Sequence, residues 1–529
     1  MIEPSISIAA RLVIGVTRHR KLDTNPAFIQ GINLAIEESR QIAPSLKSTP
    51  LVLSILSPLA EGADRMVARE VLKVPGSMLE VVLPLEKDDY MQDFGTSESR
   101  DEFEELLSQA RSVRLLSSKS HRSEAYEQVG RYIVDQCDVL IALWDGKPAA
   151  DRGGTAKTVQ YARETGCPLV WINTEDSGQV TVEVGRGLNP RPFQDIEKYN
   201  SERINAVRFE KQLKAGCDFF MNEARRAKLP ATFLRPTLEY ILRHYVRADL
   251  VALRYQHLHY RIESLVYALA LVAVAIAAFQ VLFIPDQSMI LISEVALMLA
   301  ALAMVGIVRR RRWHTKWIDY RFLAERFRSA LFIAVANTDV ATLRPPRHLS
   351  LSYSSKDWMV AAFSSVWSQR PRFKGSDSST FEGLRHFLCE AWLEDQVRYH
   401  DGTSKRHYQR HIRMGRASYV MFGLTICAVL LHIMDIGSHL LGSILAFMAI
   451  VFPAIGASIT AIRTHRDYLR NSMRSTEMVR HLKELKGEMM LVQDRDNLLR
   501  LLRETEETML HENEDWRVVV RFHMPEVPT

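Results

Sequence analysis

Residues Ser264–Val308 read SLVYALALVAVAIAAFQVLFIPDQSMILISEVALMLAALAMVGIV, and this stretch decides the fold. The first part, Ser264–Ile284, carries no charge, and the second part, Ser288–Val308, carries only Glu294. Each part, as a helix, is long enough to cross a hydrocarbon core of about 30 Å. Because the link Pro285–Gln287 allows only a tight turn, the stretch predicts a transmembrane hairpin in preference to a buried hairpin of a soluble protein.

A second stretch, Ala417–Ile462, repeats this pattern. Its apolar parts, Ala417–Met434 and Leu440–Ile462, contain no Asp, Glu, Lys or Arg and are separated by a polar turn. Arginines flank the outer ends of both hairpins: Arg254, Arg261, Arg309, Arg310, Arg311, Arg312, Arg413, Arg416, Arg463, Arg466 and Arg470. Because basic residues stay on the cytoplasmic side, we predict four spans with both termini in the cytoplasm.

The composition limits the possible classes of function. A length of 529 residues corresponds to two or three domains, and the net charge of +6 is modest. Basic residues gather beside the spans, which favours anionic lipid headgroups over nucleic acid as a partner. The five cysteines are scattered without metal-ligand spacing, as expected of free thiols in a reducing cytosol. We therefore predict no metal and no cofactor. Without a signal-peptide pattern, the first domain is expected to stay on the side where it is made.

Short apolar, β-branched runs alternate with helical patterns in the first part of the chain. The predicted strands are Leu12–Thr17, Leu51–Leu56, Leu79–Leu85, Ser112–Leu116, Val139–Trp144 and Pro168–Ile172. This alternation predicts a parallel sheet with helices on both faces. The fold class is therefore an α/β Rossmann-like domain followed by an all-α membrane domain with four transmembrane helices in two hairpins.

Glycines and polar side chains follow these strands at the carboxyl ends, where α/β sheets bind ligands. The candidate ligand-binding residues are Gly15, Thr17, Arg18, Arg20, Ser57, Glu61, Gly62, Asp64, Arg65, Asp145, Gly146, Gly153, Gly154 and Thr155. Glycines let the backbone approach a ligand, and the amides of a helix that starts after Gly154 favour an anion. The arginines could bind phosphate bidentately. Each glycine alone is also explained as a turn residue, but their convergence at one sheet edge favours a site.

Two of these loops resemble loops of a known superfamily. Ser57–Asp64, which reads SPLAEGAD, resembles a loop of the DNA-processing (Smf) proteins. Gly153–Thr155 resembles the end of the phosphate loop in the "Lonely Guy" phosphoribohydrolases. Residues 10–175 are thus similar to the SLOG superfamily, whose Rossmann-like domains bind nucleotides or nucleotide-derived signals. The resemblance implies a nucleotide-derived second messenger, with an adenine type favoured, as the ligand.

The chain departs from the enzymes of that superfamily. They place a catalytic glutamate shortly after the glycine-rich loop, where this chain has Ala156, Lys157 and Thr158 and no acid before Glu164. Arg18 also stands where relatives often have glycine. Because no carboxylate is present to assist a leaving group, we predict a sensor without catalytic residues.

An internal repeat is visible around the hairpins. Arg254–Gln256 precedes the first hairpin and resembles His407–Gln409 before the second. Ala324–Arg328 follows the first hairpin and resembles Thr476–Arg480 after the second, at nearly the same offset. Each unit is therefore predicted to be helix, two spans and helix. Residues 237–529 resemble the SLATT group, two-span effector domains that occur beside SLOG sensors.

These patterns divide the chain into five parts. Residues 1–180 form the SLOG-like domain, and residues 181–236 form a linker and a helix. The first SLATT-like unit covers residues 237–340, and an irregular cytosolic connector covers 341–380. The second SLATT-like unit, with a C-terminal helix, covers 381–529.

The predicted link between sensor and spans is a helix that continues from Thr237 into Ser264. Glu202–Tyr260 is expected to be the only covalent connection from the sensor to the first span. Leu482–Leu502 has leucines at helical spacing, which suits packing between copies, and two hairpins are too few for a wide pore. We therefore expect a homo-oligomer.

Glu294 is the one acidic residue deep in a span. Carboxylates inside a membrane are costly and usually face a pore or a partner, which makes Glu294 a pore candidate. A hydrogen bond to Gln280 or Ser293 would instead make it structural, and both interpretations stay open.

The leading interpretation is a membrane effector in the inner membrane of a bacterium. Its cytosolic domain senses a nucleotide-derived signal, and its spans then permeabilise the membrane. In the families that the chain resembles, this activity serves antiviral defence. The alternatives are a membrane-tethered nucleoside phosphoribohydrolase and a regulated channel or transporter. A DNA-binding role is disfavoured because the chain lacks a basic groove with interleaved aromatic residues.

Overall fold

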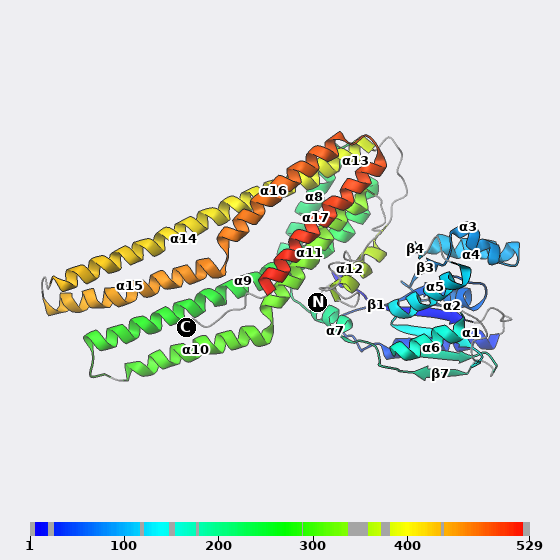
Figure 1. The fold of residues 1–529 in the computed structure, drawn as a ribbon, viewed down its shortest axis with the longest axis horizontal. Helices are drawn as coiled ribbons and strands as arrows, with labels where there is room; N and C mark the ends of the chain where they lie inside the picture. Colours follow the sequence, from blue (N-terminus) through cyan, green and yellow to red (C-terminus); the bar gives the residue numbers. More distant parts are fainter. Residues whose placement is uncertain are drawn as a thin grey trace. The chain divides into compact units, whose positions relative to one another are not determined.

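The computed structural model describes residues 6–18, 26–116, 121–147, 154–175, 179–287, 289–336, 358–371, 381–434 and 438–521 (Figure 1). The chain divides into two compact units. The N-terminal unit comprises Met1–Glu202 and Thr342–Gln369, and the helical unit comprises Arg203–Ala341 and Arg370–Thr529.

A seven-stranded sheet forms the centre of the N-terminal unit, in the order β4-β3-β2-β1-β5-β6-β7. The strands are β1 (Ala10–Arg18), β2 (Leu51–Ser57), β3 (Met78–Leu83), β4 (Ser112–Leu115), β5 (Val139–Trp144), β6 (Leu169–Asn173) and β7 (Val180–Glu183). All neighbouring pairs are parallel except β6 and β7, which are antiparallel. The predicted parallel α/β sheet is confirmed. The antiparallel edge strand β7 lies where the sequence predicted the boundary between the SLOG-like domain and the linker.

Helices cover both faces of this sheet. They are α1 (Pro26–Ile42), α2 (Ala63–Leu72), α3 (Lys87–Tyr90), the short η2 (Met91–Asp93), α4 (Ser97–Gln109), α5 (Arg122–Gln136), α6 (Thr155–Thr165), α7 (Arg191–Asn200) and α12 (Trp358–Gln369). Ile14 of β1 belongs to the buried cluster that includes Ile32 of α1. The adjacent Val13 belongs to a second cluster with Ile133 of α5. Successive side chains of a strand point to opposite faces, so the two clusters are the two sides of one sheet.

Helix α12 differs from the sequence-based expectation. Its segment was expected to be an irregular connector, but Trp358–Gln369 is a largely buried helix that packs against α7 and β1. The rings of Tyr199 and Trp358 lie 5.9 Å apart. Because α12 belongs to the N-terminal unit, the chain passes between the units after residues 202, 341 and 369. Glu202–Tyr260 is therefore not the only covalent connection.

The helical unit is built from long helices. They are α8 (Ala206–Arg226), α9 (Ala231–Phe283), α10 (Ile290–Arg311), α11 (Trp313–Val335), α13 (Phe381–Phe387), the π-helical η4 (Leu388–Glu394), α14 (Asp395–Ile433), α15 (His439–His465), α16 (Tyr468–Leu491) and α17 (Arg495–Arg521). Helix α9 includes Thr237 and Ser264, which confirms the predicted continuous helix into the first apolar stretch.

The two predicted repeats share one arrangement. In each, a long helix turns into a second apolar helix, and a third helix runs back along the first: α9–α10–α11 and α14–α15–α16 (Figure 1). The third helix begins after a non-glycine residue in the left-handed conformation, Arg312 (φ 52°) or Asp467 (φ 49°). This common sharp turn supports the interpretation of the sequence repeat.

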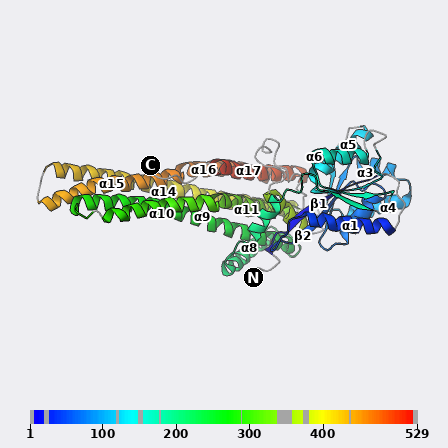
Figure 2. The same cartoon turned by 90° about the horizontal axis from the view of Figure 1, so that it is seen from below.

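The two hairpins lie side by side because α15 packs against α9, as both views show (Figures 1 and 2). Phe447 of α15 lies edge-on to Phe279 and Phe283 of α9, with ring centroids 6.5 and 6.2 Å apart. Aromatic contacts of this geometry stabilise helix packing beyond the area that they bury.

Among the described residues, four helices are long and apolar enough to cross a membrane: Leu234–Phe283, Ile290–Arg311, Phe381–Ile433 and His439–Leu491. The rest of the chain buries only a small part of the apolar segment of each helix: 22, 11, 11 and 17%, in the order given. Large apolar side chains such as Ile292 and Phe422 are exposed along them. A continuous apolar surface of this kind marks contact with lipid or with another protein.

Candidate functional site

The carboxyl edge of the sheet brings several predicted site residues together. Strand β1 lies between β2 and β5, and the chain builds one side of the sheet before it returns to the other side at β5. Such a reversal creates the crevice where open α/β sheets bind ligands. The loops after β2 and β5 both leave the sheet at this edge, next to the end of β1.

The start of α6 has the properties of an anion-binding position. Gly154 precedes the helix in an extended conformation, and among the described residues other than its chain neighbours no heavy atom lies within 4 Å of where its Cβ would be. Thr155 is only 4% exposed, and its hydroxyl has no hydrogen-bond partner among the described residues. The amides of Lys157 and Thr158 both bond to the Gly154 carbonyl, at 3.1 Å. The first amides of a helix, together with its dipole, favour a negative charge at this position.

The loop after β2 is held in shape by its own residues. The Ser57 hydroxyl accepts a hydrogen bond from the Leu59 amide at 3.0 Å. Leu59 (φ 55°) and Gly62 (φ 85°) both adopt left-handed conformations, and Gly62 caps α2. Glu61 accepts a hydrogen bond from the Gly95 amide at 2.9 Å. Ser57 and Glu61 thus stabilise the conformation of the loop, independently of any ligand.

Arg65 is explained by packing. It is 1% exposed, its Nε donates to the Leu59 carbonyl at 3.0 Å, and its Nη1 donates to the Ser99 carbonyl at 2.7 Å. Its guanidinium lies 4.5 Å above the Phe94 ring. Arg65 therefore ties α2 to α4, and its neighbour Asp64 is buried in the first turn of α2, where the helix dipole favours a carboxylate.

Gly15 lies inside β1, away from the loop. A Cβ there would lie 2.6 Å from the Ile133 side chain and 3.0 Å from the Cys137 side chain, both at the end of α5. Its position is explained by the close approach of α5 to the sheet. The glycine signal in the sequence did not distinguish such packing from ligand binding.

The remaining predicted residues that the structure describes lie at the end of β1 or directly after β5. Thr17 is near the end of β1, and Asp145 accepts a hydrogen bond from the Lys147 amide at 3.1 Å. Gly146 has φ 80° in the turn after β5. Arg20, Gly153 and the side chain of Arg18 lie outside the described residues. Thr17 and Asp145 thus lie at the ends of the neighbouring strands β1 and β5, and Gly154 and Thr155 lie at the start of the helix that comes next in the chain, while Gly15 and Arg65 serve the core.

The helical unit contains an ionic cluster that the sequence analysis did not predict. The Glu263 side chain is 2% exposed and lies between two residues that follow the other hairpin. Glu263 Oε1 lies 2.9 Å from His465 Nδ1, and Oε2 lies 3.5 Å from Arg466 Nε. Arg466 also donates to the Ser264 hydroxyl at 2.7 Å and to the Tyr260 carbonyl at 3.1 Å. These pairings join residues far apart in sequence, so only the tertiary structure reveals them.

A second ionic network joins α9 to α11 within the first repeat. Arg321 donates to Asp249 at 2.7 Å and pairs with Glu325, which also pairs with Arg328. Burial raises the pKa of Asp249, and the Arg321 guanidinium opposes this shift. The second repeat joins its first and third helices differently, through the hydroxyls of Ser404 and Thr476, 2.7 Å apart.

Glu294 lies on the face of α10 that packs toward α9. Ala301 and Val305, which share this face, belong to a buried cluster with Val266 of α9. The two expected partners of Glu294 bond to backbone carbonyls instead. Gln280 donates to Pro285 at 3.2 Å, and Ser293 donates to Ile290 at 2.6 Å.

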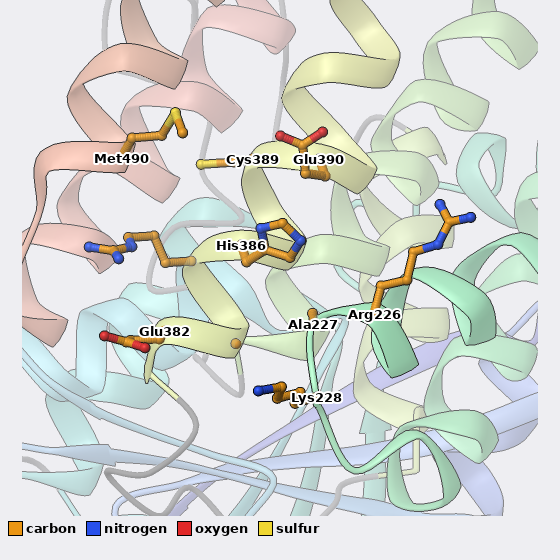
Figure 3. A pocket seen from close by; sticks show the side chains of 10 residues that line it. Arg226, Ala227, Lys228, Glu382, His386, Cys389, Glu390 and Met490 are labelled. Carbon is orange, nitrogen blue, oxygen red and sulfur yellow. The ribbon is translucent and has the colours of Figure 1, made fainter.

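A cavity of about 360 Å³ lies in the helical unit between the α8–α9 turn, α13, η4 and the end of α16 (Figure 3). It is lined by Arg226, Ala227, Lys228, Glu382, Gly383, Arg385, His386, Cys389, Glu390 and Met490. The lining mixes charges of both signs, with Arg226, Lys228 and Arg385 against Glu382 and Glu390. Gly383 is required there, because a Cβ would lie 2.4 Å from the Ala227 carbonyl.

Within the described ranges, no three His, Cys, Asp or Glu side chains are grouped as metal ligands. No family model matches the chain, and no curated protein matches it.

Gly15→Ala should destabilise the N-terminal unit by about 1–3 kcal/mol, because the new methyl group would overpack the contact with Ile133. Gly154→Ala is the matched control and should change stability little, since the space beside Gly154 is open and its φ is extended. Thermal unfolding followed by circular dichroism measures both. Equal melting temperatures for the two variants would contradict the packing role.

Three buried histidines should make the helical unit sensitive to acid. Burial, and then neighbouring positive charge, lowers the pKa of His244 and His259 to about 3 and that of His400 to about 4. The unfolded chain takes up these protons near pH 6.5 and the folded chain does not, so stability falls as pH decreases from about 6.5. Each histidine should contribute a loss of about 2 kcal/mol by pH 5.

Melting temperatures between pH 7.5 and pH 5 measure this effect. His244→Leu should flatten the pH dependence, whereas His386→Leu, at an exposed position, should leave it unchanged. A wild-type melting temperature that is constant over this range would show that the histidines are not buried as neutral groups.

Proposed function

We propose that this protein is a membrane-embedded effector whose N-terminal unit senses a nucleotide-derived anion and whose helical unit permeabilises the membrane in response. The observation that carries the proposal is the apolar surface of four helices that the chain itself leaves largely uncovered. Exposing that much apolar surface to water costs free energy, whereas contact with the acyl chains of a bilayer does not. The proposed location is the inner membrane of a bacterium.

The charges beside the spans support one orientation. Arg309, Arg310 and Arg311 form the last turn of α10, and Arg463 lies in the last turn of α15. The two hairpin turns lie at the other ends of the spans and contain no Lys or Arg. Under the positive-inside rule, both turns face away from the cytoplasm, and the N-terminal unit and the C-terminus lie in the cytoplasm.

The ligand proposed for the N-terminal unit is a phosphorylated, adenine-type signal. Two observations support an anion: the first turn of α6 presents amides, and the Thr155 hydroxyl is available beside them. The first turn of α6 carries no carboxylate, although the phosphoribohydrolases that this loop resembles place a catalytic glutamate shortly after it, and this difference favours sensing over hydrolysis. The resemblance to nucleotide-sensing domains favours an adenine base over other anions.

Helix α12 offers a route by which binding could reach the spans. It packs against β1 and α7, and its end is connected directly to Arg370 and Pro371 of the helical unit. The Pro371 carbonyl accepts a hydrogen bond from the Thr237 hydroxyl, near the start of α9, at 2.6 Å. In this proposal a ligand that prefers one arrangement of α12 shifts the position of α9 by at most that free-energy preference.

In this proposal conduction requires several copies of the chain, because two hairpins pack against each other and leave no wide opening. Glu294 contributes to the conducting path, and the Glu263–Arg466 pair holds the two hairpins together. Loss of membrane integrity on receipt of a nucleotide signal would serve antiviral defence by abortive death of the cell.

The proposed topology can be tested with reporter fusions placed after Asp286, Ser350, Gly437 and Thr529. Fusions at Ser350 and Thr529 should report a cytoplasmic location, and those at Asp286 and Gly437 a periplasmic one, because of the distribution of arginines. A periplasmic signal at Ser350 would overturn the topology.

The ligand-gated activity can be tested with purified protein in liposomes that contain a fluorescent dye. Dye release should occur only when an adenine nucleotide from a panel of AMP, ADP-ribose and cyclic AMP is added. Gly154→Asp should abolish release and lower nucleotide affinity at least about tenfold by calorimetry, because its carboxylate repels phosphate. Gly154→Ala, which adds no charge, should retain both properties.

Two outcomes would contradict the proposal. Liposomes that leak equally without nucleotide would exclude gating, and liposomes that stay impermeable with saturating nucleotide would exclude permeabilisation. Glu294→Leu separates the steps, because it should alter the rate of release without altering nucleotide affinity.

A further inference from the structure

Two cysteines of the N-terminal unit, Cys137 and Cys167, lie close together. Their Sγ atoms are 3.7 Å apart, although thirty residues separate them in sequence. Cys137 follows α5 and is buried, whereas Cys167 follows α6 and is partly exposed. Both are present as thiols rather than as halves of a disulfide.

The strand register explains this proximity. Leu140 of β5 pairs with Leu169 of β6, so continuing the same register places Asp138 opposite Cys167. Cys137 and Cys167 are therefore one residue out of register at the amino ends of neighbouring parallel strands. Adjacent strands lie about 4.8 Å apart, which is compatible with the Cα separations of about 4.4–6.8 Å found in disulfides.

The surroundings leave room for the bond to form. Gly15 of β1 faces Cys137, and a Cβ on Gly15 would lie 3.0 Å from the Cys137 sulfur. The absence of that side chain provides the space that the Cys137 thiol occupies. Each thiol also contacts a carbonyl of its own turn, Val134 for Cys137 and Pro168 for Cys167.

The two thiols differ in reactivity. The hydrogen bond between the thiols and then burial raise the pKa of Cys137, so this residue stays protonated at neutral pH. Cys167 is the more exposed of the pair, and an oxidant therefore reaches it first. This arrangement of an accessible cysteine beside a second thiol is typical of redox-responsive pairs.

We propose that Cys137 and Cys167 form a reversible disulfide when the protein meets hydrogen peroxide. The Cys167 thiol loses a proton and its sulfur attacks the peroxide, which gives a sulfenic acid and releases water. The Cys137 thiol then loses a proton, its sulfur attacks the Cys167 sulfur, and a second water leaves. In total, two thiols and one hydrogen peroxide give one disulfide and two waters. A dithiol reductant reverses the reaction by exchange.

The disulfide would connect the end of α5 to the turn that follows α6. It would therefore hold together the β5–β6 half of the sheet, on the side opposite the proposed anion position at the start of α6. The inference does not depend on membrane permeabilisation or on nucleotide binding.

The test uses the full-length protein in detergent, treated with hydrogen peroxide and then denatured and alkylated. Peptide mass spectrometry should find a peptide containing Cys137 linked to one containing Cys167, with the loss of two hydrogen atoms, and dithiothreitol should remove the link. Thermal unfolding of the oxidised protein should shift upward by roughly 5–10 °C, because the cross-link restricts the unfolded chain.

Single cysteine variants show which residues form the disulfide. Cys137→Ser should leave a sulfenic acid on Cys167 that dimedone traps, whereas Cys217→Ser, which changes a cysteine outside the pair, should form the disulfide as wild type does. The wild-type measurement stands even if Cys137→Ser does not fold. Full alkylation of both cysteines after peroxide treatment, or a disulfide between different cysteines, would overturn the proposal.

Discussion

The physical constraint on which this structure depends is the apolar surface of four helices that the chain does not cover. No more than about a fifth of any of their apolar windows is buried internally. Apolar surface contributes about 25 cal/mol for each Å² removed from water, so an environment must supply the missing contacts. In such an environment every backbone amide and carbonyl must be paired within the segment, which requires helices. The hairpins, the short turns and the arginines at their ends all follow from this requirement.

Buried charge is found next to these apolar segments and joins parts of the helical unit that are distant in sequence. Glu263 contacts residues that follow the other hairpin, and Asp249 contacts α11 through Arg321. Removal of one partner from a buried pair leaves an uncompensated charge and costs about 3–5 kcal/mol. Such pairs therefore specify which helices associate and in what position. Apolar contacts between similar surfaces are less specific. The continuous α9 connects these pairs to Thr237, which lies near the start of this helix.

In the N-terminal unit, packing explains several of the residues that the sequence analysis assigned to a ligand-binding site. Gly15 makes room for α5, Arg65 ties α2 to α4, and Ser57 shapes its own loop. Packing does not explain the start of α6, where the Thr155 hydroxyl has no hydrogen-bond partner among the described residues. A short glycine-containing loop in a sequence therefore predicts a sharp or crowded backbone, and only geometry shows whether a ligand or a neighbouring helix occupies the space.

Both fold classes could be predicted from the residues alone, because hydrophobic periodicity and length reflect which faces of a strand or helix are covered. The same patterns predicted the four apolar helices, the continuous helix through Thr237 and Ser264, and the repeated hairpin unit. Three features became visible only in the folded chain: α12 belongs with the sheet, Glu263 meets Arg466, and Cys137 lies beside Cys167. The reason is that these contacts join segments distant along the chain, and a local pattern of residues carries no information about which distant partner it will meet.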